Sequence, residues 1–287
     1  MSKLVIGGVS LSHLRDRDIQ ALFASAEALG VHEIDTAPAY GLSEEKIGKN
    51  LKNFEIKVNS KIFSPDVDSI SRREVRRSVD NSLSLLRLES LHTLFLHSIR
   101  EPLYRAEIHE ELLKLKSEGK IVNLGYSGDG YDLRTLTSSY KFDAFQATLN
   151  VVDLGNLQFI RSNESMQSYI KRPLCNQVFK IKPKLEAVDF FYRLKRSESR
   201  DPQSYLARYK ALFGNRLFAR GGVDKVFGFI MSLHLNSKII VGVSSVDHLA
   251  YLANLTSEFP TWSELEIAEH TDNWTRMANE ETWKTLT

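Results

Sequence analysis

An acid and a phenol lie five residues apart in the segment 33–44, whose sequence is EIDTAPAYGLSE. Asp35 ends a short apolar run that is typical of a strand, and Tyr40 lies in the loop that follows it. Lys61 comes near the end of the next apolar run, and His97 ends the run after that. We therefore expect a carboxylate, a phenol, an ammonium and an imidazole at the ends of successive strands.

These four groups suit the reduction of a carbonyl, which needs a hydride and a proton for the oxygen. A phenol is a weak acid at neutral pH, with an ordinary pKa of about 10, and a nearby ammonium stabilises its ionised form. We expect Lys61 to do this for Tyr40, Asp35 to pair with Lys61, and neutral His97 to donate a hydrogen bond to the carbonyl oxygen. Each residue alone also suits a structural ion pair, a packed tyrosine or a core histidine. Their conjunction at three strand ends favours catalysis.

Eight apolar runs rich in β-branched residues alternate with amphipathic stretches, which is typical of parallel strands joined by helices. The predicted strands are 4–9, 33–36, 56–62, 93–97, 122–127, 144–149, 168–174 and 238–243. The predicted helices are 16–29, 43–53, 71–87, 104–118, 131–139, 155–162, 203–236 with a break, and 245–257. Strict alternation predicts an α/β fold, a (β/α)8 TIM barrel, as a single domain over 1–287. In such barrels the catalytic side chains come from the C-terminal ends of strands.

Local signals support this pattern, and two regions depart from it. Ser43, followed by two glutamates, is expected to cap a helix, and Gly119 to end one. A long connection at 180–225 is rich in lysine, arginine and aromatic residues. Its basic run 193–196 suits either a phosphorylated substrate or a solvated helix face. The tail from about 260 is predicted to be helical, either as a lid over the site or packed on the barrel exterior.

The composition is that of a soluble globular protein, with 42% hydrophobic and 26% charged residues. A formal net charge of +2 indicates no particular class of partner, and we expect neither nucleic acid nor a membrane. The single cysteine, Cys175, excludes a disulfide framework within the chain and indicates a reducing compartment. The apolar run after the N-terminal methionine is too short for a secretion signal, so a cytoplasmic location is predicted.

The four groups and their spacing resemble the catalytic tetrad of the aldo-keto reductases. The similarity continues in GKIVNLGYS at 119–127, which resembles the strand-five signature of that family, and in FQATLN at 145–150, which resembles strand six. KRPL at 171–174 is similar to the end of strand seven. IIVGVSSVDHL at 239–249 is similar to the segment that binds the adenosine phosphate.

The resemblance implies a small-molecule carbonyl substrate and a nicotinamide cofactor, NADP (NADPH), with NAD possible. It assigns general acid catalysis to Tyr40 and the carboxamide of the cofactor to Ser127 and Gln146. A helix N-terminus binds anions, which suits Ser244 and Ser245, although both serines are also explained as helix caps. The cofactor-binding residues implied are Ser127, Gln146, Arg172, Leu174, Ser244, Ser245 and His248.

The sequence departs from the family pattern around the cofactor. Gly128 stands where the family usually has asparagine, and Lys171 or Arg172 stands where an aromatic ring usually stacks on the nicotinamide. An arginine or glutamine usual near His248 is also missing. A dinucleotide-binding sensor or regulatory protein with little turnover is therefore an alternative. A metal-dependent lyase is a third, but no cluster of metal ligands lies at the predicted strand ends, and no metal is expected.

Overall fold

A computed structural model describes residues 2–63, 69–176, 202–214 and 222–279 of the chain. The chain separates into two compact units. The first comprises residues 1–148, 156–171 and 236–257, and the second comprises 149–155, 172–235 and 258–287. All the strands named below belong to the first unit, and each unit is described by itself.

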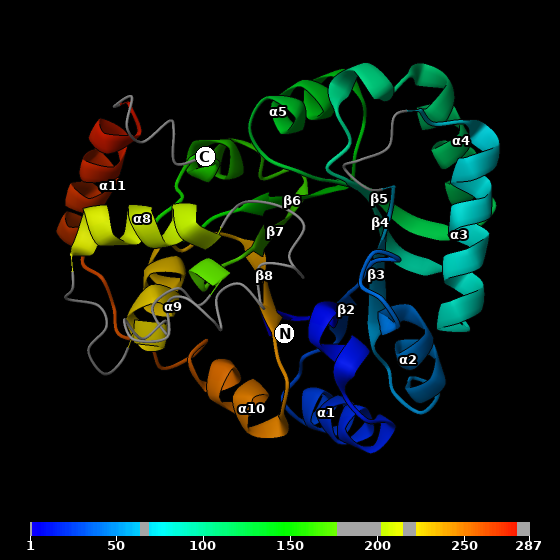
Figure 1. The fold of residues 1–287 in the computed structure, drawn as a ribbon, viewed down its shortest axis with the longest axis horizontal. Coiled ribbons are helices and arrows are strands. Elements are labelled where there is room, and N and C mark those ends of the chain that lie inside the picture. The colour runs from blue at the N-terminus through cyan, green and yellow to red at the C-terminus, as the bar shows by residue number, and fades with distance from the viewer. Residues whose placement is uncertain (1, 64–68, 177–201, 215–221, 280–287) are drawn as a thin grey trace. The chain divides into compact units, whose positions relative to one another are not determined.

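The first unit is a closed barrel of eight parallel strands in chain order (Figure 1). Pairing of β1 with β8 closes the ring, with Leu4 opposite Ile239. The strands are β1 (Leu4–Gly7), β2 (Glu33–Asp35), β3 (Lys57–Ile62), β4 (Leu91–His97), β5 (Ile121–Ser127), β6 (Ala144–Thr148), β7 (Gln167–Lys171) and β8 (Ser237–Gly242). The predicted α/β fold and (β/α)8 barrel are confirmed.

Helices follow the strands of the barrel. Helices α2 and α3 touch through their backbones, because a Cβ at Gly48 would lie 2.1 Å from the Leu85 carbonyl oxygen. The helical segments of this unit are η1 (Gly8–His13), α1 (Asp16–Ala28), α2 (Ser43–Asn50), α3 (Arg72–Leu86), η2 (Glu101–Leu103), α4 (Ala106–Ser117), α5 (Gly130–Ser139), α6 (Leu157–Ser162) and α10 (Val246–Asn254).

Helix ends agree with the sequence at one predicted position and differ at another. Gly119 follows α4 with φ of +79°, a conformation that glycine adopts readily, so the predicted stop is confirmed. Ser43 was expected to be an N-cap, and this was wrong. It is the first residue of α2, and its hydroxyl instead bonds Gly8 O at 2.8 Å and Thr36 Oγ1 at 2.8 Å.

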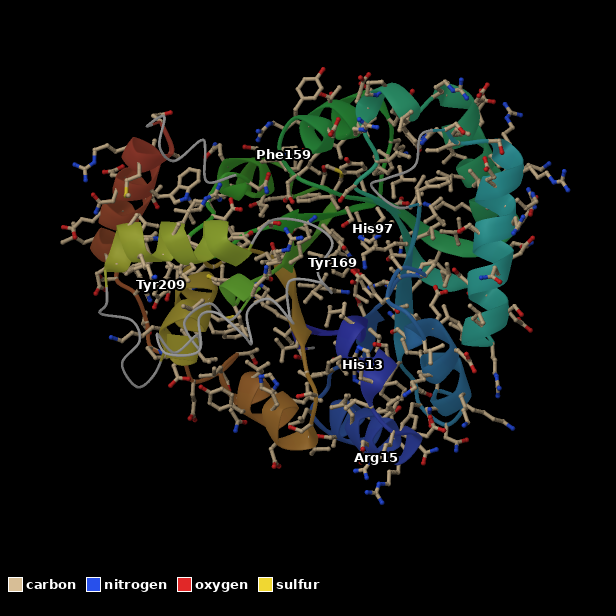
Figure 2. All side chains as sticks on the ribbon, viewed as in Figure 1. His13, Arg15, His97, Phe159, Tyr169 and Tyr209 are labelled. Atoms are coloured by element: carbon tan, nitrogen blue, oxygen red, sulfur yellow. The ribbon has the colours of Figure 1, made fainter. Side chains whose placement is uncertain are left out.

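The interior of the barrel is part apolar and part polar. Val5, Phe95, Ala144 and Tyr169 form a buried cluster. At the start of β2, buried Glu33 accepts hydrogen bonds from Tyr169 Oη at 3.1 Å and from Lys238. Figure 2 shows Tyr169 and His97 among the strands. The N-terminal end of the barrel is therefore held by its own charged network, apart from the strand ends where the predicted site lies.

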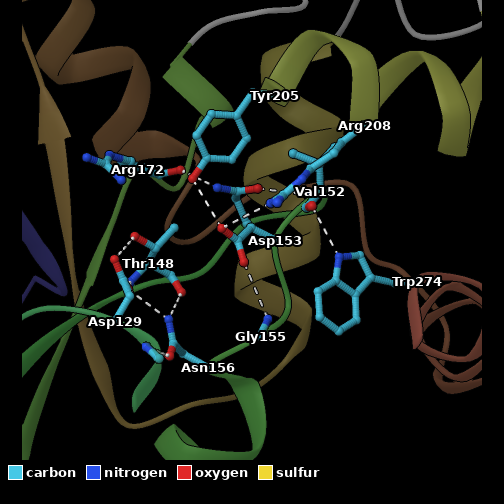
Figure 3. A network of polar contacts seen from close by, with 12 residues as sticks. Asp129, Thr148, Val152, Asp153, Gly155, Asn156, Arg172, Tyr205, Arg208 and Trp274 are labelled. Carbon is cyan, nitrogen blue, oxygen red and sulfur yellow. Dashed lines mark hydrogen bonds and ion pairs between the residues drawn. The ribbon is translucent and has the colours of Figure 1, made fainter. Parts of the chain in front are cut away.

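The second unit contains α8 (Pro202–Phe213), α9 (Gly222–Ser232) and α11 (Glu264–Ala278). Its core surrounds His270, whose Nε2 lies 2.7 Å from Val151 O and whose ring contacts Phe229. Buried Asp153 accepts from Tyr205 at 3.3 Å and lies 3.7 Å from Arg208 (Figure 3).

The tail from about 260 is helical as predicted, because it contains α11. The connection at 180–225 contains α8 and the start of α9, while its basic run 193–196 lies outside the described residues. Among the described helices, none is long and apolar enough to cross a membrane.

Candidate active site

A buried ion pair forms the centre of the predicted site. Lys61 Nζ donates to Asp35 Oδ2 at 2.5 Å and to Thr36 O at 2.9 Å. Lys61 is 2% exposed and Asp35 is 3% exposed. Burial lowers the pKa of Lys61, but the charges of Asp35 and Tyr40 outweigh burial, and the pKa is raised above its ordinary value. The lysine is therefore a fixed cation at neutral pH.

Tyr40 and His97 meet this cation at the same end of the barrel. Lys61 Nζ lies 4.8 Å from the centre of the Tyr40 ring. The rings of Tyr40 and His97 have centroids 6.0 Å apart and are nearly perpendicular. The Tyr40 loop turns where its N–H donates to Ala37 O at 3.0 Å. The structure thus brings together the four side chains that the sequence singled out.

Asp35 has a second partner that sequence reasoning did not foresee. Gln146 Nε2 donates to Asp35 Oδ1, so that each carboxylate oxygen accepts a hydrogen bond. Gln146 is 1% exposed and lies beside Ser127 across the β5–β6 pairing. Gln146 was predicted to bind the carboxamide of a cofactor. In this structure its amide nitrogen donates to the Asp35 carboxylate.

A second carboxylate, with 9% of its side chain exposed, lies near the ends of β5, β6 and β7. Asp129 accepts from Thr148 N at 2.7 Å, Thr148 Oγ1 at 3.0 Å and Asn156 Nδ2 at 2.8 Å (Figure 3). Lys171 Nζ lies 3.3 Å from the same carboxylate. The position that an aromatic ring usually fills in the resembling family therefore holds one half of an ion pair.

Gly128 packs closely against the side chain of Tyr126. A Cβ at Gly128 would lie 2.4 Å from the ring of Tyr126, which no side chain tolerates without movement. Tyr126 is 1% exposed, and its hydroxyl donates to Ile99 O at 2.8 Å. A side chain at position 128 would therefore have to displace a buried, hydrogen-bonded tyrosine.

The start of α10 has the features expected of an anion site. Ser245 is the N-cap, and its hydroxyl accepts from His248 N at 3.2 Å. Ser244 and Ser245 are both exposed. The capping explanation for Ser245 is therefore confirmed. An exposed helix start can also bind an anion, because its first N–H groups have no partner within the helix.

Arg172 and Leu174, the two remaining predicted cofactor residues, belong to the second unit. Arg172 has φ of +57°, and its carbonyl oxygen accepts from Asn150 Nδ2 at 3.0 Å. Leu174 is 7% exposed. The assignment of these two residues to the cofactor therefore stays a prediction.

Comparison with known proteins decides the family. A model of the "Aldo/keto reductase family" matches residues 3–210. The chain belongs to the aldo/keto reductase family. Its (β/α)8 barrel is the fold that the sequence resemblance implied.

Among curated relatives of this aldo/keto reductase is L-galactose dehydrogenase of Arabidopsis thaliana, 33% identical over 129 residues, which are 41% of this chain and 40% of the relative. Another is D-arabinose 1-dehydrogenase of Saccharomyces cerevisiae, 27% identical over 204 residues, 63% of this chain and 59% of the relative. The matches thus span about half the length of these relatives. An aldo-keto reductase of Klebsiella pneumoniae, solved in complex with NADPH, has a TM-score of 0.68 at 19% identity, covering 95% of this chain and 90% of that one.

The residues of this aldo/keto reductase fit a nicotinamide cofactor in part. Ser127 and Gln146 are adjacent at two strand ends, and the start of α10 suits a phosphate. The ion pair of Lys171 with Asp129 is polar where a ring would stack. Within the described part of the chain, no group of three or more His, Cys, Asp or Glu is placed to hold a metal ion.

Sequence reasoning missed three contacts in the site. Thr36 contributes a carbonyl oxygen to Lys61, Asp129 holds Lys171, and Gln146 holds Asp35. Asp129 carried a signal, since it is a carboxylate directly after strand five. The other two contacts join residues whose pairing no spacing in the sequence reveals.

Proposed function

We propose that this chain is an NAD(P)-dependent oxidoreductase that interconverts an aldehyde or ketone and an alcohol, with Tyr40 as the general acid and base. One observation carries the proposal: the Lys61 ammonium is held by the Asp35 carboxylate at 2.5 Å while it lies 4.8 Å from the Tyr40 ring. An ion pair that only supports the fold needs no phenol beside its cation. A phenol that exchanges a proton at neutral pH needs such a cation.

In the reducing direction, the Tyr40 hydroxyl donates its proton to the carbonyl oxygen, and Lys61 stabilises the phenolate that remains. Asp35 keeps Lys61 in place and charged, and Gln146 fixes the other oxygen of Asp35. His97 donates a hydrogen bond to the same carbonyl oxygen and orients it. A nicotinamide cofactor, when bound, would supply the hydride that the carbonyl carbon needs. In the oxidising direction, the Tyr40 phenolate accepts the proton of the alcohol.

For the cofactor, Ser127 and Gln146 are assigned to the carboxamide, and Ser244, Ser245 and His248 to the adenosine phosphate. Arg172 and Leu174 keep their assignment to the pyrophosphate loop. We infer NADPH as the cofactor, with NAD possible, because a related barrel was solved with NADPH and α10 offers a helix start to a phosphate.

For the substrate, we infer a small hydroxylated carbonyl compound of the aldose class. Two curated relatives carry the names of sugar dehydrogenases. Asp129 and Lys171, both partly exposed, and buried Thr148 supply polar groups near three adjacent strand ends, which suits a substrate rich in hydroxyl groups. We also infer a cytoplasmic location, which the single buried cysteine supports.

A sensor that binds dinucleotide with little turnover is the second candidate. It is favoured by the Gln146 amide that is engaged by Asp35, and by the ion pair where a stacking ring would lie. Both features would weaken the binding of a nicotinamide, while all four residues of the tetrad are kept.

The test replaces Tyr40 by phenylalanine. Turnover is followed at 340 nm with D-arabinose and L-galactose plus NADP⁺ or NAD⁺, and with simple aldehydes plus NADPH. Cofactor affinity is followed by NADPH fluorescence. We expect Tyr40→Phe to lose about 10²–10⁴ in rate while its affinity for NADPH stays within about threefold, because only the proton donor is lost.

Tyr131→Phe is the matched control, since that tyrosine is 71% exposed and lies outside the tetrad. It should retain full turnover. A Tyr40→Phe variant with more than about half the wild-type rate would overturn the assignment. NADPH binding by the wild type without turnover of any substrate would favour the sensor.

A further inference from the structure

A buried carboxylate just outside the barrel takes no part in the chemistry described above. Glu44 is the second residue of α2 and is 1% exposed, whereas its neighbour Glu45 is exposed. Buried glutamates are rare unless a specific contact holds them. The carboxylate therefore requires an explanation beyond the amphipathic pattern of its helix.

Glu44 is attached to the strand that carries the catalytic lysine. Ser60 Oγ donates to Glu44 Oε1 at 2.6 Å, and both residues are fully enclosed. Side chains alternate along a strand, so Ser60 faces the helices while Lys61, the next residue, faces the barrel interior. A shift of Ser60 along the strand would move Lys61 by the same amount.

Helix α2 is packed closely against its neighbour on the other side. Its Gly48 approaches the Leu85 carbonyl oxygen of α3 so nearly that a Cβ there would lie 2.1 Å from it. Burial raises the pKa of Glu44, while the hydroxyls of Ser60 and Ser82 and the charge of Lys61 act in the opposite direction. The charge of Lys61 thus acts on the pKa of the Glu44 carboxyl group, although the two side chains lie on opposite faces of β3.

The loop that carries Tyr40 is fixed at both ends by the same set of contacts. At its start, Thr36 N donates to Asn59 O at 2.8 Å and Thr36 O accepts from Lys61. At its end, Ser43 bonds Gly8 O and the Thr36 hydroxyl, and Glu44 bonds Ser60. The hydrogen bond of Glu44 is the contact that ties the end of the loop to β3.

We propose that Glu44 is a positioning residue that, through Ser60, sets the distance between the Tyr40 phenol and the Lys61 ammonium. This role rests on the proposed function, in which the lysine stabilises the phenolate. Glu44 does not touch substrate or cofactor. Its loss should impair turnover rather than substrate binding.

The experiment compares Glu44→Ala, Glu44→Gln, Ser60→Ala and the double variant Glu44→Ala/Ser60→Ala, with Glu45→Ala as the matched control. We expect Glu44→Ala and Ser60→Ala each to lower kcat about tenfold with KM within about threefold, because each misplaces the cation by breaking the same hydrogen bond. The double variant should be no worse than either single variant. Glu44→Gln keeps an acceptor oxygen and should recover kcat to within about threefold of wild type.

A second readout needs no turnover. The ultraviolet difference between each protein and its Tyr40→Phe counterpart follows ionisation of the Tyr40 phenol as pH is raised. In Glu44→Ala this ionisation should move about one pH unit higher, because the phenolate has lost part of its cation, while Glu45→Ala should match the wild type.

The outcomes separate the two proposals. If the wild type has no turnover that depends on Tyr40, the proposed function is wrong. If Glu44→Ala still shows the expected shift in phenol ionisation, the positioning role of Glu44 stands. Unchanged kcat and unchanged ionisation in Glu44→Ala would overturn the positioning role, as would a Glu44→Gln variant as defective as alanine. If Glu44→Ala does not fold, Ser60→Ala tests the same hydrogen bond from the strand side.

Discussion

Replacing Lys61 by methionine removes the ammonium while keeping an unbranched side chain, and it should affect stability and turnover together. The wild-type pair is almost fully enclosed, with Lys61 2% and Asp35 3% exposed. The variant would bury the Asp35 carboxylate with the Gln146 amide as its donor. Breaking a buried pair from one side costs about 3–5 kcal/mol, because the remaining charge is uncompensated. We expect the free energy of unfolding to fall by that amount.

The stability measurement is urea unfolding at pH 7, followed by tryptophan fluorescence and circular dichroism. The pH is chosen from the pKa of Lys61, which is raised above its ordinary 10.5. A group whose pKa is higher in the folded state contributes its stability fully below the unfolded value and loses it above the folded value. At pH 7 the contribution of Lys61 is therefore fully present in the wild type.

The double variant Asp35→Asn/Lys61→Met provides the matched control. It removes both charges and keeps the oxygen and nitrogen of an amide, so it should recover more than half of the lost stability. It should not recover turnover, which we expect to be reduced by about 10²–10⁴ in both variants. A Lys61→Met protein as stable as the wild type, or a double variant less stable than the single one, would refute the interpretation of the pair.

Two further predictions concern acid and the cofactor. Burial lowers the pKa of His92, His109 and His270, and it outweighs the opposing charge of Glu33 on His92 and the hydrogen bond of Val151 to His270. The folded state therefore resists protonation, and stability should fall as pH drops below about 6.5. A thermal unfolding midpoint that is equal or higher at pH 5.5 than at pH 7.5 would contradict this. His248→Arg should lower the dissociation constant of NADPH about tenfold and leave that of NADH nearly unchanged, because a guanidinium adds a charge-assisted hydrogen bond to the 2′-phosphate. Both dissociation constants are measured by nicotinamide fluorescence. An equal decrease for both cofactors would argue against this prediction.

The strands and the grouping of the tetrad could be predicted from the sequence because both follow from short-range patterns. Apolar runs of β-branched residues marked the strands, and a parallel barrel places every strand C-terminus at one end. Asp35, Lys61 and His97 were therefore expected together before any contact was known. Their catalytic roles remain predictions, which the variants above test.

The contacts around the tetrad could not be predicted in this way. The Gln146 bond to Asp35 depends on how the strands are offset around the barrel, which no local pattern fixes. Ser43 has the composition of an N-cap, and its hydroxyl found better partners in Gly8 and Thr36 once the loop closed. In both cases the tertiary structure decided among partners that local chemistry left equivalent.

The close approach of Gly128 to Tyr126 couples two positions in the sequence. A Cβ at position 128 would lie 2.4 Å from the Tyr126 ring, so a larger residue there has to displace the tyrosine. A smaller side chain at 126 would give up the hydrogen bond to Ile99 and leave a cavity. We therefore expect each single substitution to cost stability, and the paired substitution to cost less than the two single costs added together.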